Sequence, residues 1–212
     1  MKMKVEVKET KLEYDGFVKV EKAIIRFERF NGEMSKETER HRFFRSDAVG
    51  VLIYDSAAHR VLLQRQFRYT AHAKTSQGWL TECVAGMMEE NETPWEVAQR
   101  EVFEETGLRL RRADLVAHYF IGPGGSSDQV YLFLGEVDNP CQAVGVHGLI
   151  EEGEEIEARW VPLEEALQWV DERKIQDAKT LIGLMLLDRH LRKIRVHDSP
   201  ASLADGSRPA GC

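Results

Sequence analysis

The chain has 212 residues, of which 42% are hydrophobic and 31% are charged, and its formal net charge is −7. These values are typical of one water-soluble globular unit whose core needs no disulfide or metal, and they disfavour a disordered or membrane-embedded chain. The excess of acidic residues disfavours a nucleic-acid partner, because nucleic-acid-binding surfaces are basic. Three widely spaced cysteines without a C-x-x-C pair, and a charged N-terminus in place of a signal peptide, favour the cytoplasm and no membrane partner.

Residues 1–46 are interpreted as an N-terminal β-rich subdomain. Apolar residues alternate with polar ones in short stretches, for example at Val5 and Val7, and this alternation is typical of strands. Asn31-Gly32 is a strong signal for a hairpin turn, because both residues tolerate a positive φ angle.

Residues 47–194 are interpreted as the main domain, which mixes strands and helices. Apolar runs of strand length occur at 49–54, 61–66, 115–121, 129–137 and 156–161, and helical patterns occur at 94–106, 163–173 and about 177–194. Residues 195–212 have little apolar periodicity and several glycines and prolines, so we expect a disordered tail there.

Local signals set both ends of the helix expected over residues 94–106. Thr93 and Glu96 match a T-x-x-E capping box, and Pro94 suits the first position of a helix. Gly107 can adopt the left-handed conformation that ends a helix. On this helix the core-facing residues are Trp95, Ala98 and Val102.

Three carboxylates share the adjacent face of the same helix, those of Glu101, Glu104 and Glu105. Like charges at this spacing repel one another, so they need either full solvation or a bound cation. Oxygen ligands without a nearby cysteine or a pair of histidines favour Mg²⁺ or Mn²⁺ over zinc. Taken alone, a solvated acidic helix face is the commoner explanation of such a run.

The wider segment is far more specific than its carboxylates. From Gly86 to Leu108 it matches G-x5-E-x7-R-E-U-x-E-E-x-G-U at every position, where U is a bulky aliphatic residue. Chance would produce this match in such a chain with a probability on the order of one in ten million. The pattern is the Nudix box, and the chain resembles the Nudix hydrolases. The resemblance implies an α/β (α+β) fold, with a mixed β-sheet sandwiched between helices.

Within that family the chain is most similar to the bacterial ADP-ribose pyrophosphatases, and the resemblance implies a role for each residue of the box. Glu101 and Glu105 are implied as metal ligands, and Ala85 as a ligand through its carbonyl. Glu104 is implied as a catalytic residue that either binds the metal or supports a residue that does. Arg100 is also implied as a catalytic residue, and it is expected to pair with Glu92 and so fix the loop before the helix. Gly86 and Gly107 are implied as the structural glycines of the motif.

A second acidic cluster follows in the run His147-Gly-Leu-Ile-Glu-Glu-Gly-Glu154. Taken alone it is interpreted as a solvated loop. In the ADP-ribose group, however, a loop of this form carries the catalytic base and an extra metal ligand. That resemblance implies Glu152 as the base and Glu154 as the ligand, although it leaves open which of the two is the base.

The resemblance covers about residues 14–193. It implies a homodimer with exchanged N-terminal strands, in which Phe17 stacks on adenine, while Arg40, Arg68 and Glu82 contact the diphosphate or the terminal ribose. Pro123, at the family's spacing beyond the box, marks the ADP-ribose group. The alternatives are a core position for Phe17, a surface charge for each arginine and a plain tight turn at Pro123.

The expected reaction is metal-dependent hydrolysis of ADP-ribose to AMP and ribose 5-phosphate. Hydrolysis of GDP-mannose or another nucleoside diphosphate sugar is a near alternative, because the box does not read the base or the sugar. A Nudix-fold sensor that binds a nucleotide without turning it over is an alternative of another class, and the complete Arg100-Glu101-x-x-Glu104-Glu105 run counts against it.

Overall fold

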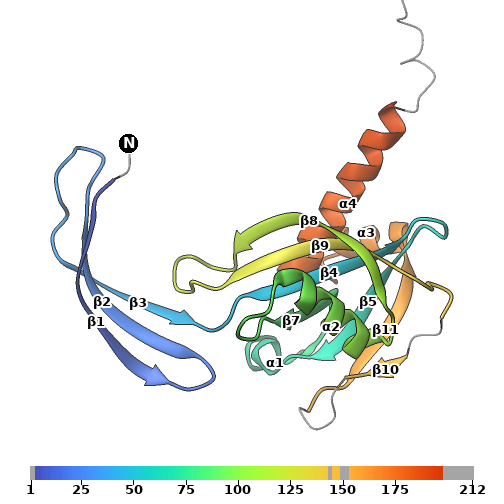
Figure 1. Ribbon diagram of the computed structural model, residues 1–212, viewed down its shortest axis with the longest axis horizontal. Helices are drawn as coiled ribbons and strands as arrows, with labels where there is room; N and C mark the ends of the chain where they lie inside the picture. The colour runs from blue at the N-terminus through green and yellow to red at the C-terminus, as the bar shows by residue number, and fades with distance from the viewer. Residues whose placement is uncertain (1–2, 143–144, 149–152, 198–212) are drawn as a thin grey trace, which may run out of the picture.

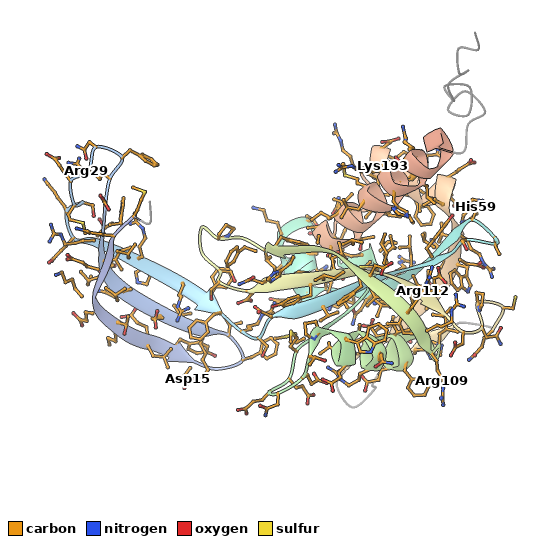
Figure 2. The ribbon with its side chains drawn as sticks, turned by 45° about the horizontal axis from the view of Figure 1, so that its top comes forward. Asp15, Arg29, His59, Arg109, Arg112 and Lys193 are labelled. Atoms are coloured by element: carbon orange, nitrogen blue, oxygen red, sulfur yellow. The ribbon has the colours of Figure 1, made fainter. Side chains whose placement is uncertain are left out.

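The computed structural model describes residues 3–142, 145–148 and 153–197. Its first part is a separate antiparallel sheet in the order β1-β2-β3, made of β1 (Val5–Asp15), β2 (Lys19–Phe27) and β3 (Thr38–Phe44). This sheet projects from the rest of the molecule (Figure 1). Asp15 and Arg29 lie toward its opposite ends, and side chains stand out from both of its faces (Figure 2).

The turn expected at Asn31-Gly32 joins β2 to β3, but only one residue of the pair takes a positive φ. Gly32 has φ of 83°, whereas Asn31 does not adopt the left-handed region. Instead, the Asn31 side chain accepts a hydrogen bond from the Glu33 amide at 3.1 Å. The asparagine therefore serves this turn through its side chain and not through its backbone conformation.

The main sheet has eight strands and is mixed. Six of them follow the order β10-β11-β5-β4-β9-β8, with β6 paired to β5 and β7 to β4. β4 and β9 are parallel, and the other pairs are antiparallel. The strands are β4 (Ala48–Asp55), β5 (Arg60–Phe67), β6 (Trp79–Glu82), β7 (Val84–Met87), β8 (Leu110–Phe120), β9 (Gln129–Val137), β10 (Val146–His147) and β11 (Ile156–Pro162).

Helices cover both faces of the main sheet (Figure 1). They are α1 (Tyr69–Thr75), α2 (Pro94–Thr106), α3 (Leu163–Asp171) and α4 (Ala178–His197). The buried residues form two hydrophobic cores, because neighbouring residues of β4 point to opposite faces of the sheet. Val51 belongs to the core that includes Val102 of α2, whereas Leu52 belongs to the core that includes Leu184 of α4. The expected mixed sheet between helices is confirmed.

Several boundaries differ from those expected. The four elements α1, β6, β7 and β10 were not predicted, because α1 buries no residue and the three strands have four residues or fewer. α4 runs to His197, although a disordered tail was expected from residue 195, because Lys193 and Arg195 favour helix. Residues 198–212 of that tail lie outside the described residues. Among the helices of the described ranges, none combines the length and the apolar character that crossing a membrane requires.

Candidate active site

α2 begins and ends at the residues that the sequence indicates. The Thr93 hydroxyl accepts a hydrogen bond from the Glu96 amide at 3.3 Å, and the Glu96 carboxylate accepts one from the Thr93 amide at 2.8 Å. Gly107 has φ of 69°, and its amide donates to the Phe103 carbonyl at 2.8 Å. These contacts fix the two ends of α2, as the local sequence signals predict.

Arg100 joins α2 to the loop that precedes it. Its Nε and Nη2 donate to the two carboxylate oxygens of Glu92 at 3.0 and 3.1 Å, and Nη2 also reaches the Met87 carbonyl at 3.2 Å. Its Nη1 donates to Glu101 at 2.7 Å and to Glu104 at 3.2 Å. The structure therefore brings Arg100 and Glu92 together, and the same guanidinium neutralises part of the charge of two further carboxylates.

Gly86 leaves room for the carboxylate of Glu101. A Cβ atom at position 86 would lie 1.6 Å from Glu101 Oε1 and 1.8 Å from Glu101 Cδ. The φ angle of Gly86 is not positive, so space and not backbone conformation requires glycine here. The glycine of β7 thus forms a cradle that holds Glu101 against the strand containing Ala85.

Glu105 is the most deeply buried carboxylate of the helix, with a relative exposure of 3%. Its Oε2 accepts hydrogen bonds from Gln64 Nε2 at 2.8 Å and from the Ala85 amide at 3.1 Å. Burial raises the pKa of Glu105 to about 8; the Gln64 hydrogen bond opposes this shift and the Glu101 charge adds to it. Burial also raises the pKa of Glu101, although Arg100 opposes that shift. Among the described residues Glu105 therefore has no ion pair, and Glu101 shares the single charge of Arg100 with Glu92 and Glu104.

Glu154, in the segment before β11, lies near enough to the same carboxylates for its charge to act on them. Its Oε1 accepts a hydrogen bond from Gln66 Nε2 at 3.4 Å, and its charge raises the pKa of both Glu101 and Glu105. Gly148 makes this approach possible, because it has φ of 101° and a Cβ there would lie 2.9 Å from the Glu154 carbonyl oxygen. Glu152, the expected base, lies outside the described residues.

The donor set fits a hard divalent cation. Glu101, Glu105 and Glu154 offer only oxygen atoms, and the raised pKa values of the first two indicate a site that needs positive charge. Within residues 3–142, 145–148 and 153–197, however, no three His, Cys, Asp or Glu side chains are grouped closely enough to hold a metal. Arg100 accounts for part of this, because it draws Glu101 and Glu104 toward itself.

Arg68 and Glu82, expected to contact the substrate, form a bidentate pair with each other. Arg68 Nε and Nη2 donate to the two Glu82 oxygens at 2.9 and 3.0 Å. Lys179, at the start of α4, donates to Glu82 at 2.8 Å and to Asp177 at 2.7 Å. Burial alone would raise the pKa of Glu82, but Arg68 and Lys179 lower it to about 2. Sequence reasoning missed Lys179, because only the fold brings it to Glu82.

Two of the expected substrate contacts belong to residues 1–46, and a third, Pro123, lies in the connection between β8 and β9 that is hydrogen-bonded to β3. Phe17 lies between β1 and β2 and is 77% exposed, so it is not a core residue. Arg40 lies on β3, where its Nη1 donates to the Glu39 carbonyl at 2.9 Å. Pro123 is exposed in a turn whose Gly125 carbonyl accepts from the amide of Phe43 in β3 at 2.9 Å. The structure does not bring these residues to the carboxylates within one chain.

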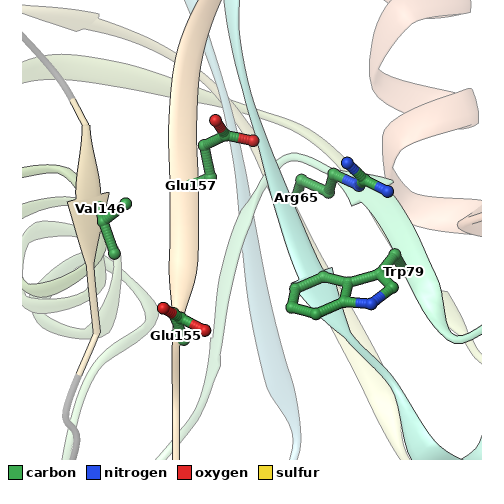
Figure 3. Close-up of a pocket in the computed structure, with 5 residues that line it drawn as sticks. All are labelled: Arg65, Trp79, Val146, Glu155 and Glu157. Atoms are coloured by element: carbon green, nitrogen blue, oxygen red, sulfur yellow. The ribbon is translucent and has the colours of Figure 1, made fainter.

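A cavity of about 370 Å³ lies on the opposite face of β5 and β11 from Gln64 and Gln66. Its lining residues are Arg65, Trp79, Val146, Glu155 and Glu157 (Figure 3). Arg65 and Glu157 are directly paired across the two strands, so their side chains share that face. The cavity is therefore separate from the carboxylate cluster.

Comparison with known proteins agrees with this geometry. The NUDIX domain family model matches residues 44–182. The chain is 39% identical over 182 residues to an ADP-ribose pyrophosphatase of Escherichia coli K12, covering 86% of this chain and 87% of that protein. It is 35% identical over 185 residues to one of Haemophilus influenzae, covering 86% and 85%. It is also 31% identical over 188 residues to a GDP-mannose pyrophosphatase of Cronobacter sakazakii, covering 88% and 96%.

The family match spans most of the chain and contains all the carboxylates described above. Nudix hydrolases generally need a divalent metal, which the oxygen donors of the site suit. On these grounds the chain belongs to the NUDIX domain family and is a Nudix hydrolase.

Proposed function

We propose that this protein is a cytoplasmic enzyme that hydrolyses the diphosphate bond of ADP-ribose to AMP and ribose 5-phosphate, with Mg²⁺ or Mn²⁺ as the metal. The observation that carries the proposal is the desolvated pair Glu101 and Glu105 in a chain that resembles ADP-ribose pyrophosphatases along most of its length. The free thiols of Cys83 and Cys141 support a reducing compartment.

Glu101, Glu105 and Glu154, with the Ala85 carbonyl, would hold the metal, and Glu104 would be a further ligand or support one. When bound, the metal supplies positive charge that polarises the phosphoryl group and lowers the pKa of water. Glu152 takes the proton from the attacking water, and Glu154 is the alternative base. Arg100 and Glu92 keep the loop before α2 in place during the reaction.

Arg68 is the best supported substrate contact. Glu82 uses its Nε and Nη2, no described residue accepts from Nη1, and the side chain remains 35% exposed. A guanidinium held in this way is preorganised to bind a diphosphate oxygen. Glu82 would contact the terminal ribose or act through Arg68, and Pro123 would shape the turn next to the substrate.

We also propose that the protein is a homodimer in which residues 1–46 bind the adenine base across the interface, with Phe17 and Arg40 serving the partner's site. The sheet of β1, β2 and β3 exposes large apolar side chains, and a contiguous apolar surface marks a site of interaction with another chain. They include Val5, Val7, Leu12, Tyr14, Phe17, Phe27 and Phe43. Sedimentation at micromolar concentration should give twice the chain mass, and a monomer would contradict the shared site.

A panel of substrates tests the reaction. With Mg²⁺, we expect kcat/KM for ADP-ribose to exceed those for GDP-mannose, UDP-glucose and NADH by at least about tenfold, with AMP as a product. A preference for GDP-mannose would support the alternative named by the more distant relatives. No turnover of any compound would favour a nucleotide sensor. The Glu105→Gln variant is the control for a contaminating hydrolase.

A further inference from the structure

Two glutamines lie on one face of β5, the face that looks toward α2. Gln64 is 1% exposed and Gln66 is 5% exposed, and Leu62 precedes them on the same face. Gln64 Nε2 donates to Glu105 at 2.8 Å and Gln66 Nε2 donates to Glu154 at 3.4 Å. One strand therefore reaches a carboxylate from α2 and a carboxylate from the segment before β11.

The carbonyl ends of both amides are buried without a donor. Among the described residues, neither Gln64 Oε1 nor Gln66 Oε1 has a hydrogen-bond partner. A buried, unpaired amide carbonyl costs free energy that an apolar side chain of similar size would not. Packing alone does not explain this pair of amides, whereas a ligand with hydrogen-bond donors at the site would.

Their places in the sheet make the two glutamines a rigid support. Gln64 is paired with Ala158 of β11 on one side and with Glu82 of β6 on the other. Gln66 is paired in the same way with Ile156 and Leu80. Because β5 is paired with a strand on both sides, the side-chain amides of Gln64 and Gln66 have fixed positions relative to α2 and to Glu154.

We propose that Gln64 and Gln66 are positioning residues of the metal site: their NH2 groups orient the carboxylates of Glu105 and Glu154, and their carbonyls accept hydrogen bonds from water molecules bound to the metal. Metal ligands are commonly oriented by such supporting hydrogen bonds, and Mg²⁺ usually keeps several of its waters. This inference rests on the proposed metal site but assigns residues outside the Nudix box.

Mn²⁺ binding without substrate tests the assignment, with free Mn²⁺ measured by electron paramagnetic resonance. The variants are Gln64→Met and Gln66→Met, and Leu62→Met is the matched control on the same strand and face. We expect Gln64→Met to weaken Mn²⁺ binding about tenfold or more, and Gln66→Met to weaken it less because its hydrogen bond is longer. Leu62→Met should bind Mn²⁺ like the parent.

The thermal midpoint of the metal-free protein separates positioning from packing. Gln64→Met removes an unpaired carbonyl but also the donor to Glu105, two changes of opposite sign, so this midpoint should shift by no more than about 4 °C. Mn²⁺ affinity of Gln64→Met within twofold of the parent would overturn the inference. So would a metal-free midpoint that falls by more than about 10 °C together with the affinity, because disturbed packing would then explain the loss. Gln66→Met gives the same readouts if Gln64→Met does not fold. If Glu105→Gln also binds Mn²⁺ normally, the proposed metal site itself is wrong.

Discussion

Glu105→Gln is expected to lower kcat/KM for ADP-ribose at saturating Mg²⁺ by about 10² or more, and to raise the thermal midpoint of the metal-free protein. The first effect follows from losing an anionic metal ligand. The second follows from burial, because an ionised carboxylate at this position lacks a compensating charge until a metal arrives. A gain in stability together with a loss of activity is typical of a functional site.

The gain in metal-free stability from Glu105→Gln is expected to increase with pH. The pKa of Glu105 is raised from 4.5 to about 8. Below pH 4.5 the group is protonated in both the folded and the unfolded chain, so it costs no stability there. Between about pH 4.5 and 8 the folded state must hold a proton or bury a charge, and stability is lost. The advantage of Glu105→Gln in metal-free buffer should therefore grow over this range.

Circular dichroism melts from pH 4.5 to 8 in EDTA, and initial rates with Mg²⁺, measure the two effects. Glu165→Gln, an exposed glutamate of α3, is the control and should change neither quantity appreciably. Activity of Glu105→Gln within about threefold of the parent would show that Glu105 is not a metal ligand. A lower metal-free midpoint at pH 8 would show that its burial is compensated in another way.

Lys179→Met is expected to destabilise the protein by about 3 kcal/mol at pH 7, because removing one member of a buried ion cluster leaves its partners without their counter-charge. Lys179 has a side-chain exposure of 15% and binds both Glu82 and Asp177. Lys174→Met is the matched control. Its ammonium group pairs with Glu172 at the surface and is 64% exposed, so the control should cost less than about 1 kcal/mol.

Acid should act on the same cluster. The pKa of Glu82 is lowered from 4.5 to about 2, so its contribution to stability is complete above pH 4.5 and is lost as the pH falls toward 2. Urea titrations between pH 2 and 7 should show this loss in the parent and a smaller loss in Lys179→Met, in which Glu82 has one cation fewer. A cost below about 1 kcal/mol for Lys179→Met at pH 7 would contradict the role of the cluster.

The sequence predicts α2 closely because its signals are local. Thr93, Glu96 and Gly107 lie within a turn of the ends that they fix, so neighbouring residues decide where the helix begins and ends. The carboxylate face follows from the helical period alone. Its chemistry does not, because a solvated acidic face fits the same spacing; the resemblance of the pattern from Gly86 to Leu108 to the Nudix box implies the metal site.

Other parts depend on contacts between distant residues. Gln64 and Glu105 are 41 residues apart and Lys179 and Glu82 are 97 apart, so no local pattern reveals either pair. β8 begins at Leu110, earlier than expected, because its exposed Arg111 and Arg112 pair with Glu136 of β9 and do not show apolar alternation. As an edge strand, β8 can begin with charged residues without burying them.

Gly86 is required by the position of a carboxylate of the proposed metal site and not by the conformation of its own strand. Its backbone is ordinary extended strand, and a sheet generally gains stability when alanine replaces a glycine in such a position. Alanine does not fit at position 86 because the Glu101 carboxylate occupies the space that its methyl group would need. Alanine at position 86 is consequently expected to displace the Glu101 carboxylate, so that its cost would fall on the proposed metal site and not on the strand.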